Sequence, residues 1–217
     1  MSIETEPGSD CQLCSRLAQF RRENRNSEPL WHNAPVSSFG PSNARLLIVG
    51  LAPGLKGANR TGRPFTGDFA GGLLYATLAK YGFSRGAYGA EPSDGLDLLG
   101  CRITNAVRCV PPQNKPVPAE IGSCNGFLAA TLREMNGLVA AVVLGRIAHD
   151  AVLTALELRK SEFRFAHGAR HRLSGNRVLF DSYHCSRYNT NTGVLTTAMF
   201  EKVFADVSAY IDGARKA

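Results

Sequence analysis

The sequence RLLIVG at residues 45–50 is a short apolar run that ends in glycine. Such a run is typical of a strand that is buried on both faces in a parallel sheet. Three further runs have the same character: CRITNAV at 101–107, LVAAVVL at 138–144 and RVLFDS at 177–182. We therefore expect four buried strands, of which the run at 138–144 has the clearest pattern.

Helices are predicted between and after these strands. A last helix is expected to begin near Thr192, because apolar residues recur every four positions along one face, at Leu195, Met199, Val203 and Val207. The other expected helices span residues 71–81, 118–135 and 147–158. Strands that alternate with helices predict an α/β fold with a parallel sheet. In such folds ligands bind beyond the carboxyl ends of the strands.

The composition is that of a globular protein with a net positive charge. Of the 217 residues, 44% are hydrophobic and 20% are charged, which argues against intrinsic disorder and favours a single domain over 1–217. No apolar run is long enough to cross a membrane, and the polar residues 1–10 do not resemble a secretory signal. We therefore expect a cytoplasmic protein without membrane contact, and we take a monomer as the default. The net charge of +7 favours a partner such as nucleic acid.

Two pairs of cysteines indicate a metal centre. Cys11 and Cys14 form a CxxC pair, and Cys109 and Cys124 lie far along the chain. Four thiolates can hold a zinc ion or an iron–sulfur cluster, and the spacing alone does not separate the two. The alternative is a set of unrelated buried thiols, but a CxxC pair in a polar N-terminal segment argues against it. We interpret Cys101, which lies within an expected strand, as a core residue.

The loop after the first strand carries reactive side chains. It begins with GLAPG at 50–54, a rigid turn whose backbone N–H groups can face an anion or a carbonyl. Two cations, Arg60 and Arg63, follow. Phe65 can stack on a planar ligand, although ordinary core packing is the alternative. Asp68 fits a helix N-cap and a catalytic carboxylate equally well.

The fourth strand ends in a polar stretch, SYHCSRYNTNTG at 182–193. His184 can donate a hydrogen bond to developing negative charge or move a proton. Several side chains here suit contacts with a phosphate backbone or with base edges, namely Ser186, Arg187, Tyr188 and Asn189. The alternative is a solvated loop before the last helix. Because loops with reactive side chains follow three strands, at 51–68, 105–124 and 184–193, we expect a binding site at that edge of the sheet.

Together these motifs resemble the uracil-DNA glycosylase superfamily, in particular its type B branch, family 5. The resemblance rests on six segments in order: CQLC at 11–14, GLAPG at 50–54, NRTGRPFTGD at 59–68, ITNAVRC at 103–109, PPQNKPVPAEIGSC at 111–124 and SYHCSRYNTNTG at 182–193. Leu51 stands where the type A family has an acidic residue, which leaves Asp68 as the catalytic carboxylate. Cys185 departs from the pattern, because most relatives have proline there.

The resemblance implies a three-layer α/β/α fold with a central four-stranded parallel sheet. It also implies a 4Fe–4S cluster held by Cys11, Cys14, Cys109 and Cys124. The implied activity is excision of uracil from DNA, and of other deaminated bases such as hypoxanthine or xanthine. A glycosylase of this kind flips the damaged nucleotide out of the duplex and into a pocket.

The resemblance also implies which residues contact the flipped base. The turn residues Gly50, Leu51 and Ala52 would lie against it. Phe65 would stack on its face, and the carboxamide of Asn105 would pair with its Watson–Crick edge.

Two side chains are expected to carry the chemistry. His184 would stabilise the leaving base anion, and Asp68 would position or deprotonate the attacking water. DNA contacts are expected from Arg60, Arg63, Ser186, Arg187, Tyr188, Asn189 and Asn191. The alternative function is a non-enzymatic iron–sulfur or zinc module that binds nucleic acid, but such a module has no need of Asp68, Asn105 and His184 at three converging strand ends.

Overall fold

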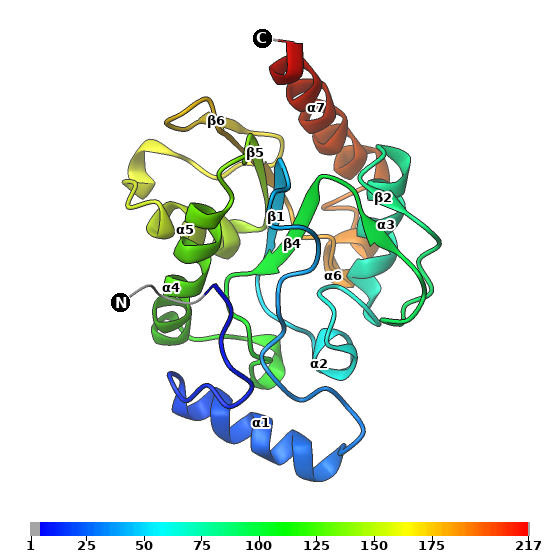
Figure 1. Cartoon of the computed structure of the whole chain (residues 1–217), viewed down its shortest axis with the longest axis vertical. Coiled ribbons are helices and arrows are strands. Elements are labelled where there is room, and N and C mark those ends of the chain that lie inside the picture. The colour runs from blue at the N-terminus through cyan, green and yellow to red at the C-terminus, as the bar shows by residue number, and fades with distance from the viewer. Residues whose placement is uncertain (1–4, 217) are drawn as a thin grey trace.

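The computed structural model describes residues 5–216 and has a five-stranded sheet at its centre (Figure 1). The strand order is β4–β1–β5–β7–β6. Four strands are parallel and buried along their whole length: β1 (Leu46–Gly50), β4 (Cys101–Asn105), β5 (Ala140–Leu144) and β7 (Val178–Ser182). These are the four strands expected from the apolar runs, with ends that differ by two residues or fewer.

The sheet has one strand more than the four expected. β6 (Arg170–Arg172) pairs antiparallel with β7 at the edge of the sheet, so the sheet is mixed rather than wholly parallel. The three residues of β6 are Arg, His and Arg, and none of them is buried. The strand therefore has no apolar run, which is the signal that revealed the other four.

Helices cover both faces of the sheet and make the three expected layers (Figure 1). Alternate residues of β1 enter separate hydrophobic cores, with Leu46 and Ile48 in one and Leu47 and Val49 in the other. The first core packs under α3 (Phe69–Lys80) and α7 (Thr197–Lys216), and the second under α4 (Pro118–Glu134) and α5 (Arg146–Ala155). Within the described residues, no helix is long and apolar enough to cross a membrane.

The segment after β7 differs from the single last helix that was expected near Thr192. It forms a short helix, α6 (Arg187–Asn191), and then a separate α7 that begins at Thr197. The side chain of Ser186 accepts a hydrogen bond from the backbone N–H of Asn189 and so caps α6. The apolar period continues through Leu195, which is buried although it precedes α7.

Several further elements were not expected from the sequence, and all but the first are short. The N-terminal helix α1 (Ser15–Ser27) is attached to α4 by a fork of two hydrogen bonds, in which Arg16 donates to both oxygens of Glu120 at 2.7 and 2.8 Å. The remaining elements are α2 (Ala58–Thr61), the antiparallel pair β2 (Ser84–Arg85) and β3 (Asp97–Leu98), and 3-10 turns at Pro112–Asn114 and Lys160–Glu162.

Candidate active site and cysteine cluster

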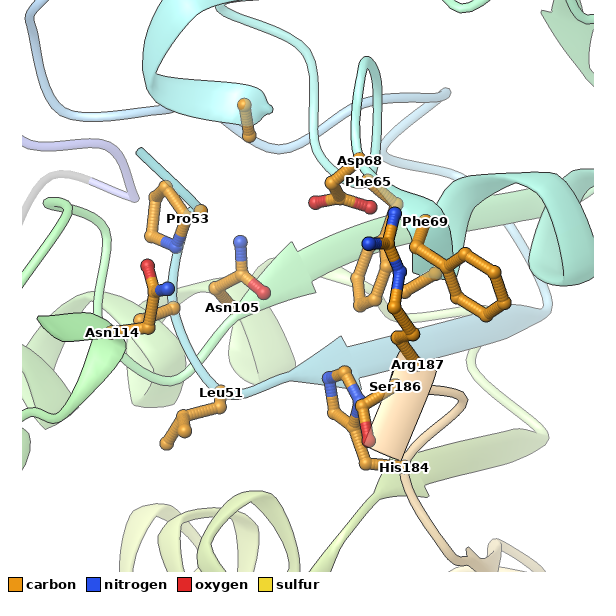
Figure 2. A pocket seen from close by; sticks show the side chains of 14 residues that line it. Leu51, Pro53, Phe65, Asp68, Phe69, Asn105, Asn114, His184, Ser186 and Arg187 are labelled. Atoms are coloured by element: carbon orange, nitrogen blue, oxygen red, sulfur yellow. The ribbon is translucent and has the colours of Figure 1, made fainter. Parts of the chain in front are cut away.

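A cavity of about 390 Å³ lies at the carboxyl edge of the parallel strands (Figure 2). Its volume is within the range of roughly 300–1,000 Å³ that is usual for small-molecule sites. The loops after β1, β4 and β7 all contribute to it, as expected from the sequence. Most of the proposed base-binding and catalytic residues line it, together with two of the proposed DNA contacts: Leu51, Ala52, Phe65, Asp68, Asn105, His184, Ser186 and Arg187.

Gly50 lies under the cavity rather than in its lining. A Cβ at this position would be 2.6 Å from Cζ of Phe65 and would overlap Oδ1 of Asn105. Only glycine therefore fits at the end of β1 while both side chains pack against it. The carbonyl of Gly50 accepts a hydrogen bond from the N–H of Ala106 at 2.9 Å, which fixes the end of β1 against the loop after β4.

Two polar atoms at the cavity are buried without a partner. Asn105 Oδ1 and His184 Nδ1 make no hydrogen bond with any residue that the structure describes. Buried polar atoms are almost always hydrogen-bonded, and leaving one unpaired costs about 1–3 kcal/mol. The ring of Phe65 lies 6.0 Å from the ring of His184, with 29° between the planes, and forms an apolar wall beside these atoms. The arrangement suits a planar ligand with polar edges.

Burial lowers the pKa of His184 to about 4, so its imidazole is neutral at pH 7. A neutral imidazole has one N–H donor and one acceptor nitrogen. The backbone around it is fixed on two sides. The side-chain amide of Asn189 donates to the His184 carbonyl at 2.8 Å, and the buried thiol of Cys185 donates to the Ala70 carbonyl in α3 at 3.6 Å. The thiol thus anchors the loop at the position where proline was expected.

Asp68 caps a helix and also lies at the cavity. Its Oδ1 accepts a hydrogen bond from the N–H of Gly71 at 3.1 Å and so caps α3. The carboxylate also lines the cavity, and burial raises its pKa. Gly57 approaches the other oxygen so closely that a Cβ there would lie 2.7 Å from Oδ2. The carboxylate thus caps α3 and is closely packed against Gly57 at the cavity.

The expected DNA contacts fall into different environments. Arg187 lies at the cavity, with its guanidinium carbon 5.1 Å from the centre of the Phe69 ring (Figure 2). Tyr188 is 74% exposed on α6, and Asn191 is exposed at the end of the same helix. Arg60 forms an ion pair with Glu91 at 2.9 Å and stays partly exposed.

Arg63 does not fit the expectation of a DNA contact. Its side chain is 5% exposed, and it donates to both oxygens of Asp94 at 2.8 and 2.6 Å. Its guanidinium also lies over the rings of Phe39 and Tyr75. The guanidinium is therefore fully engaged in contacts within the protein, and Arg63 is not part of the proposed DNA-binding surface.

Some cavity residues were missed by the sequence reasoning. They are Ala58, Phe69, Ala70 and Asn114, whereas Pro53 and Gly54 belong to the turn at 50–54 that was expected to face a ligand. Of these residues, Asn114 could most easily have been found from the sequence, because it lies in the proline-containing segment PPQN at 111–114. In the structure it has a positive φ of 57°, as does its neighbour Gln113 at 56°. Asparagine adopts this left-handed conformation more readily than most residues, so an exposed Asn in a proline-rich loop was a usable clue.

All four cysteines of the two pairs line one small cavity at the N-terminal segment. Cys14 is the N-cap residue of α1, Cys109 follows β4, and Cys124 lies in α4. Apolar side chains enclose them, chiefly Leu13, Leu17, Val107 and Phe127. None of the cysteines forms a disulfide in the described chain, and Cys101 and Cys185 are buried outside this group.

Two hydrogen-bond donors contact the cysteine sulfurs. A nitrogen of the Arg21 guanidinium donates to Sγ of Cys109 at 3.6 Å, and the backbone N–H of Arg108 donates to Sγ of Cys124 at 3.3 Å. Burial raises the pKa of both thiols, and these two contacts act in the opposite direction. Among the described residues, no three of the four sulfurs come within 4.8 Å of one another. A single tetrahedral zinc ion with bonds of about 2.3 Å would bring its sulfurs to about 3.8 Å.

The chain matches a family model described as the uracil DNA glycosylase superfamily over residues 37–208. It therefore belongs to this superfamily, and the three-layer arrangement with four parallel strands is the one that the resemblance implied, with β6 as an additional antiparallel strand.

Its similarity to type-5 uracil-DNA glycosylases extends over nearly the whole chain. It is 46% identical over 202 residues to the type-5 uracil-DNA glycosylase of Thermus thermophilus, covering 90% of this chain and 91% of the relative. It is 41% identical over 209 residues to that of Mycobacterium leprae, covering 91% and 90%. A type-4 uracil-DNA glycosylase of Archaeoglobus fulgidus is 33% identical over 124 residues, covering 57% and 54%.

The partly buried, neutral His184 makes the free energy of unfolding depend on pH. The folded pKa of about 4 is below the unfolded value of 6.5, so between these values the unfolded state binds a proton that the folded state does not. As the pH falls from 6.5 to 4, His184 therefore removes up to about 1.4 kcal/mol of stability per pH unit. We expect His184→Gln to show a shallower slope over this range in urea unfolding experiments. Equal slopes in the two proteins would contradict the neutral, buried state.

Proposed function

We propose that this protein is a DNA glycosylase that removes uracil from DNA and leaves an abasic site. The observation that carries the proposal is the pair of buried, unpartnered atoms, Asn105 Oδ1 and His184 Nδ1, at one cavity beside the Phe65 ring. A flat base with polar atoms on its edge matches this arrangement. The relatives named type-5 uracil-DNA glycosylases support the same substrate.

The damaged nucleotide must leave the duplex to reach this site, because the polar atoms lie at the bottom of a cavity. Flipping costs a few kcal/mol, least where the base pair is already weakened. Phe65 stacks on the flipped base, and Asn105 pairs with its edge. The exposed side chains of Arg187 and Tyr188 stand beside the cavity on α6, where they contact the duplex. The net charge of +7 favours approach to the phosphates.

The reaction breaks the bond between C1′ of the deoxyribose and the ring nitrogen of the base. The electron pair of this bond leaves with the base, and the neutral His184 donates a hydrogen bond to the resulting anion. The sugar becomes oxocarbenium-like, and the negative charge of Asp68 stabilises it. A water molecule adds its oxygen to C1′ and gives its proton to Asp68, whose pKa is raised towards that of a useful base.

The substrate range is proposed to include hypoxanthine and xanthine. The cavity of about 390 Å³ is large enough for a purine as well as a pyrimidine. Stacking on Phe65 does not depend on which base is present. The anion that leaves is stabilised by His184 in each case, so a single donor serves several bases.

We propose that the four cysteines at 11, 14, 109 and 124 hold a 4Fe–4S cluster. A donor set of four thiols, the wider separation of the sulfurs than one zinc ion needs, and the donors Arg21 and Arg108 all support this group. When bound, the cluster supplies a covalent cross-link between the N-terminal segment, the loop after β4, and α4. The chain's own residues carry out the excision, and the cluster has a structural role.

The activity is tested with a uracil-containing duplex, followed by alkali to cleave abasic sites. We expect strand breaks at uracil with the unaltered protein. His184→Ala should slow excision by on the order of 10²-fold for every base, because it removes a donor to the leaving anion. Asp68→Asn keeps the shape of the side chain but not its charge, and it should slow uracil excision more than xanthine excision, because uracil is the poorer leaving group.

Full uracil activity in Asp68→Asn would show that Asp68 is a helix cap alone. No breaks at uracil with the unaltered protein at high concentration would favour the nucleic-acid-binding module over the enzyme. Iron content is measured in each variant, so that loss of the cluster is not mistaken for loss of chemistry.

The cluster proposal is tested by metal analysis after anaerobic purification. We expect brown protein with about four irons and four sulfides per chain. Cys109→Ala should lose iron and thermal stability together, because cluster binding contributes to folding. Cys101→Ala is the matched control, since Cys101 is buried in β4 away from the cluster, and it should keep its iron. Colourless protein with one zinc ion would contradict the assignment.

A further inference from the structure

The backbone of Phe65 is held in an uncommon conformation. Its φ is +55°, in the left-handed region, although it is not a glycine, and its side chain is 6% exposed. Such a conformation costs of order 1–3 kcal/mol and persists only where the surroundings enforce it. The direction in which the ring points depends on this angle. The groups that enforce this φ angle therefore determine where the Phe65 ring, which forms the stacking surface of the cavity, lies.

Two tyrosine hydroxyls hold the backbone on either side of this position. The hydroxyl of Tyr75, in α3, donates to the carbonyl of Pro64 at 2.6 Å. The hydroxyl of Tyr88 donates to the carbonyl of Phe65 at 3.0 Å and accepts from the N–H of Gly67 at 3.3 Å. The two tyrosine rings stack with centres 4.6 Å apart. The Tyr88 hydroxyl thus bridges the backbone of Phe65 and that of Gly67, the residue before Asp68.

A buried ion pair holds the loop that carries Tyr88. This loop joins β2 to β3, and its Asp94 accepts hydrogen bonds from the backbone N–H groups of Gly89 and Leu96 at 2.9 and 3.0 Å. Arg63 binds both oxygens of the same carboxylate and also donates to Thr66 Oγ1 at 2.7 Å. Arg63 and Asp94 are each about 95% buried. Arg63 is thus linked through Asp94 to the loop between β2 and β3, and that loop is linked through Tyr88 to the carbonyl of Phe65.

We propose that Tyr88 is a positioning residue for base excision, which sets Phe65 and Asp68 in place before the base enters. The inference rests on the proposed function of those two residues. Tyr88 does not line the cavity, so it acts through the backbone at 65–67 and not on the base. A glycine at 71 is required beside it, because a Cβ there would overlap the Phe65 carbonyl oxygen and crowd the Tyr88 hydroxyl. Misplacement of a reacting group by about 1 Å can cost 10²-fold in rate.

The test is Tyr88→Phe, which removes the hydroxyl and keeps the ring stacked on Tyr75. Tyr210→Phe is the matched control, because its hydroxyl also donates to a backbone carbonyl, that of Asn176 at 2.9 Å, far from the cavity. We expect the single-turnover rate of uracil excision to fall about 10- to 100-fold in Tyr88→Phe and to stay unchanged in Tyr210→Phe. Affinity for an abasic duplex should be unchanged in both.

Two further variants separate positioning from a general loss of stability. Tyr75→Phe removes the hydrogen bond to Pro64 and should also slow excision. In a Phe65→Ala background, Tyr88→Phe should cost less than it does alone, because residues that act through one another are not additive. Equal rates in Tyr88→Phe, Tyr210→Phe and the unaltered protein would overturn this inference while leaving the proposed function intact. An unaltered protein that excises no uracil would instead contradict the proposed function.

Discussion

The close packing at Gly50 is the constraint on which the site depends. The absence of a side chain at the end of β1 lets the Phe65 ring and the Asn105 carboxamide lie against the strand. Because parallel strands end at one edge of the sheet, the loops after β1, β4 and β7 then meet above this point. Any larger residue at position 50 would move both side chains at once. The stacking surface and the polar edge of the site therefore both depend on this glycine.

The site holds several features that work against stability. Asn105 Oδ1 and His184 Nδ1 are buried without partners, Asp68 is buried where its charge is disfavoured, and Phe65 has a positive φ. Each unpaired atom and the positive φ cost of order 1–3 kcal/mol. Two hydrophobic cores on opposite faces of the sheet and the buried Arg63–Asp94 pair offset these costs. Unpaired polar groups of this kind are preorganised for a ligand, which satisfies them on binding.

The sequence predicts the layers and most of the cavity because both follow from local patterns. Four apolar runs reveal four strands, and the reactive side chains in the loops that follow β1 and β7 and at the end of β4 reveal the residues that meet there. β6 was missed because Arg-His-Arg has no apolar pattern, and its pairing with β7 is a tertiary effect. Arg63 was assigned to DNA because its partner, Asp94, lies thirty-one residues away. Asp68 was ambiguous because the same carboxylate caps α3 and lines the cavity.

The central claim is that unpartnered polar atoms are kept in the cavity for a base, at the expense of stability. The most direct measurement compares Asn105→Leu with the unaltered protein, using urea unfolding and single-turnover excision of uracil. Leucine has a similar size and no polar atom to bury, so we expect an unchanged or higher free energy of unfolding together with a loss of excision of at least 10²-fold. A variant that is less stable but excises uracil at the original rate would contradict the account.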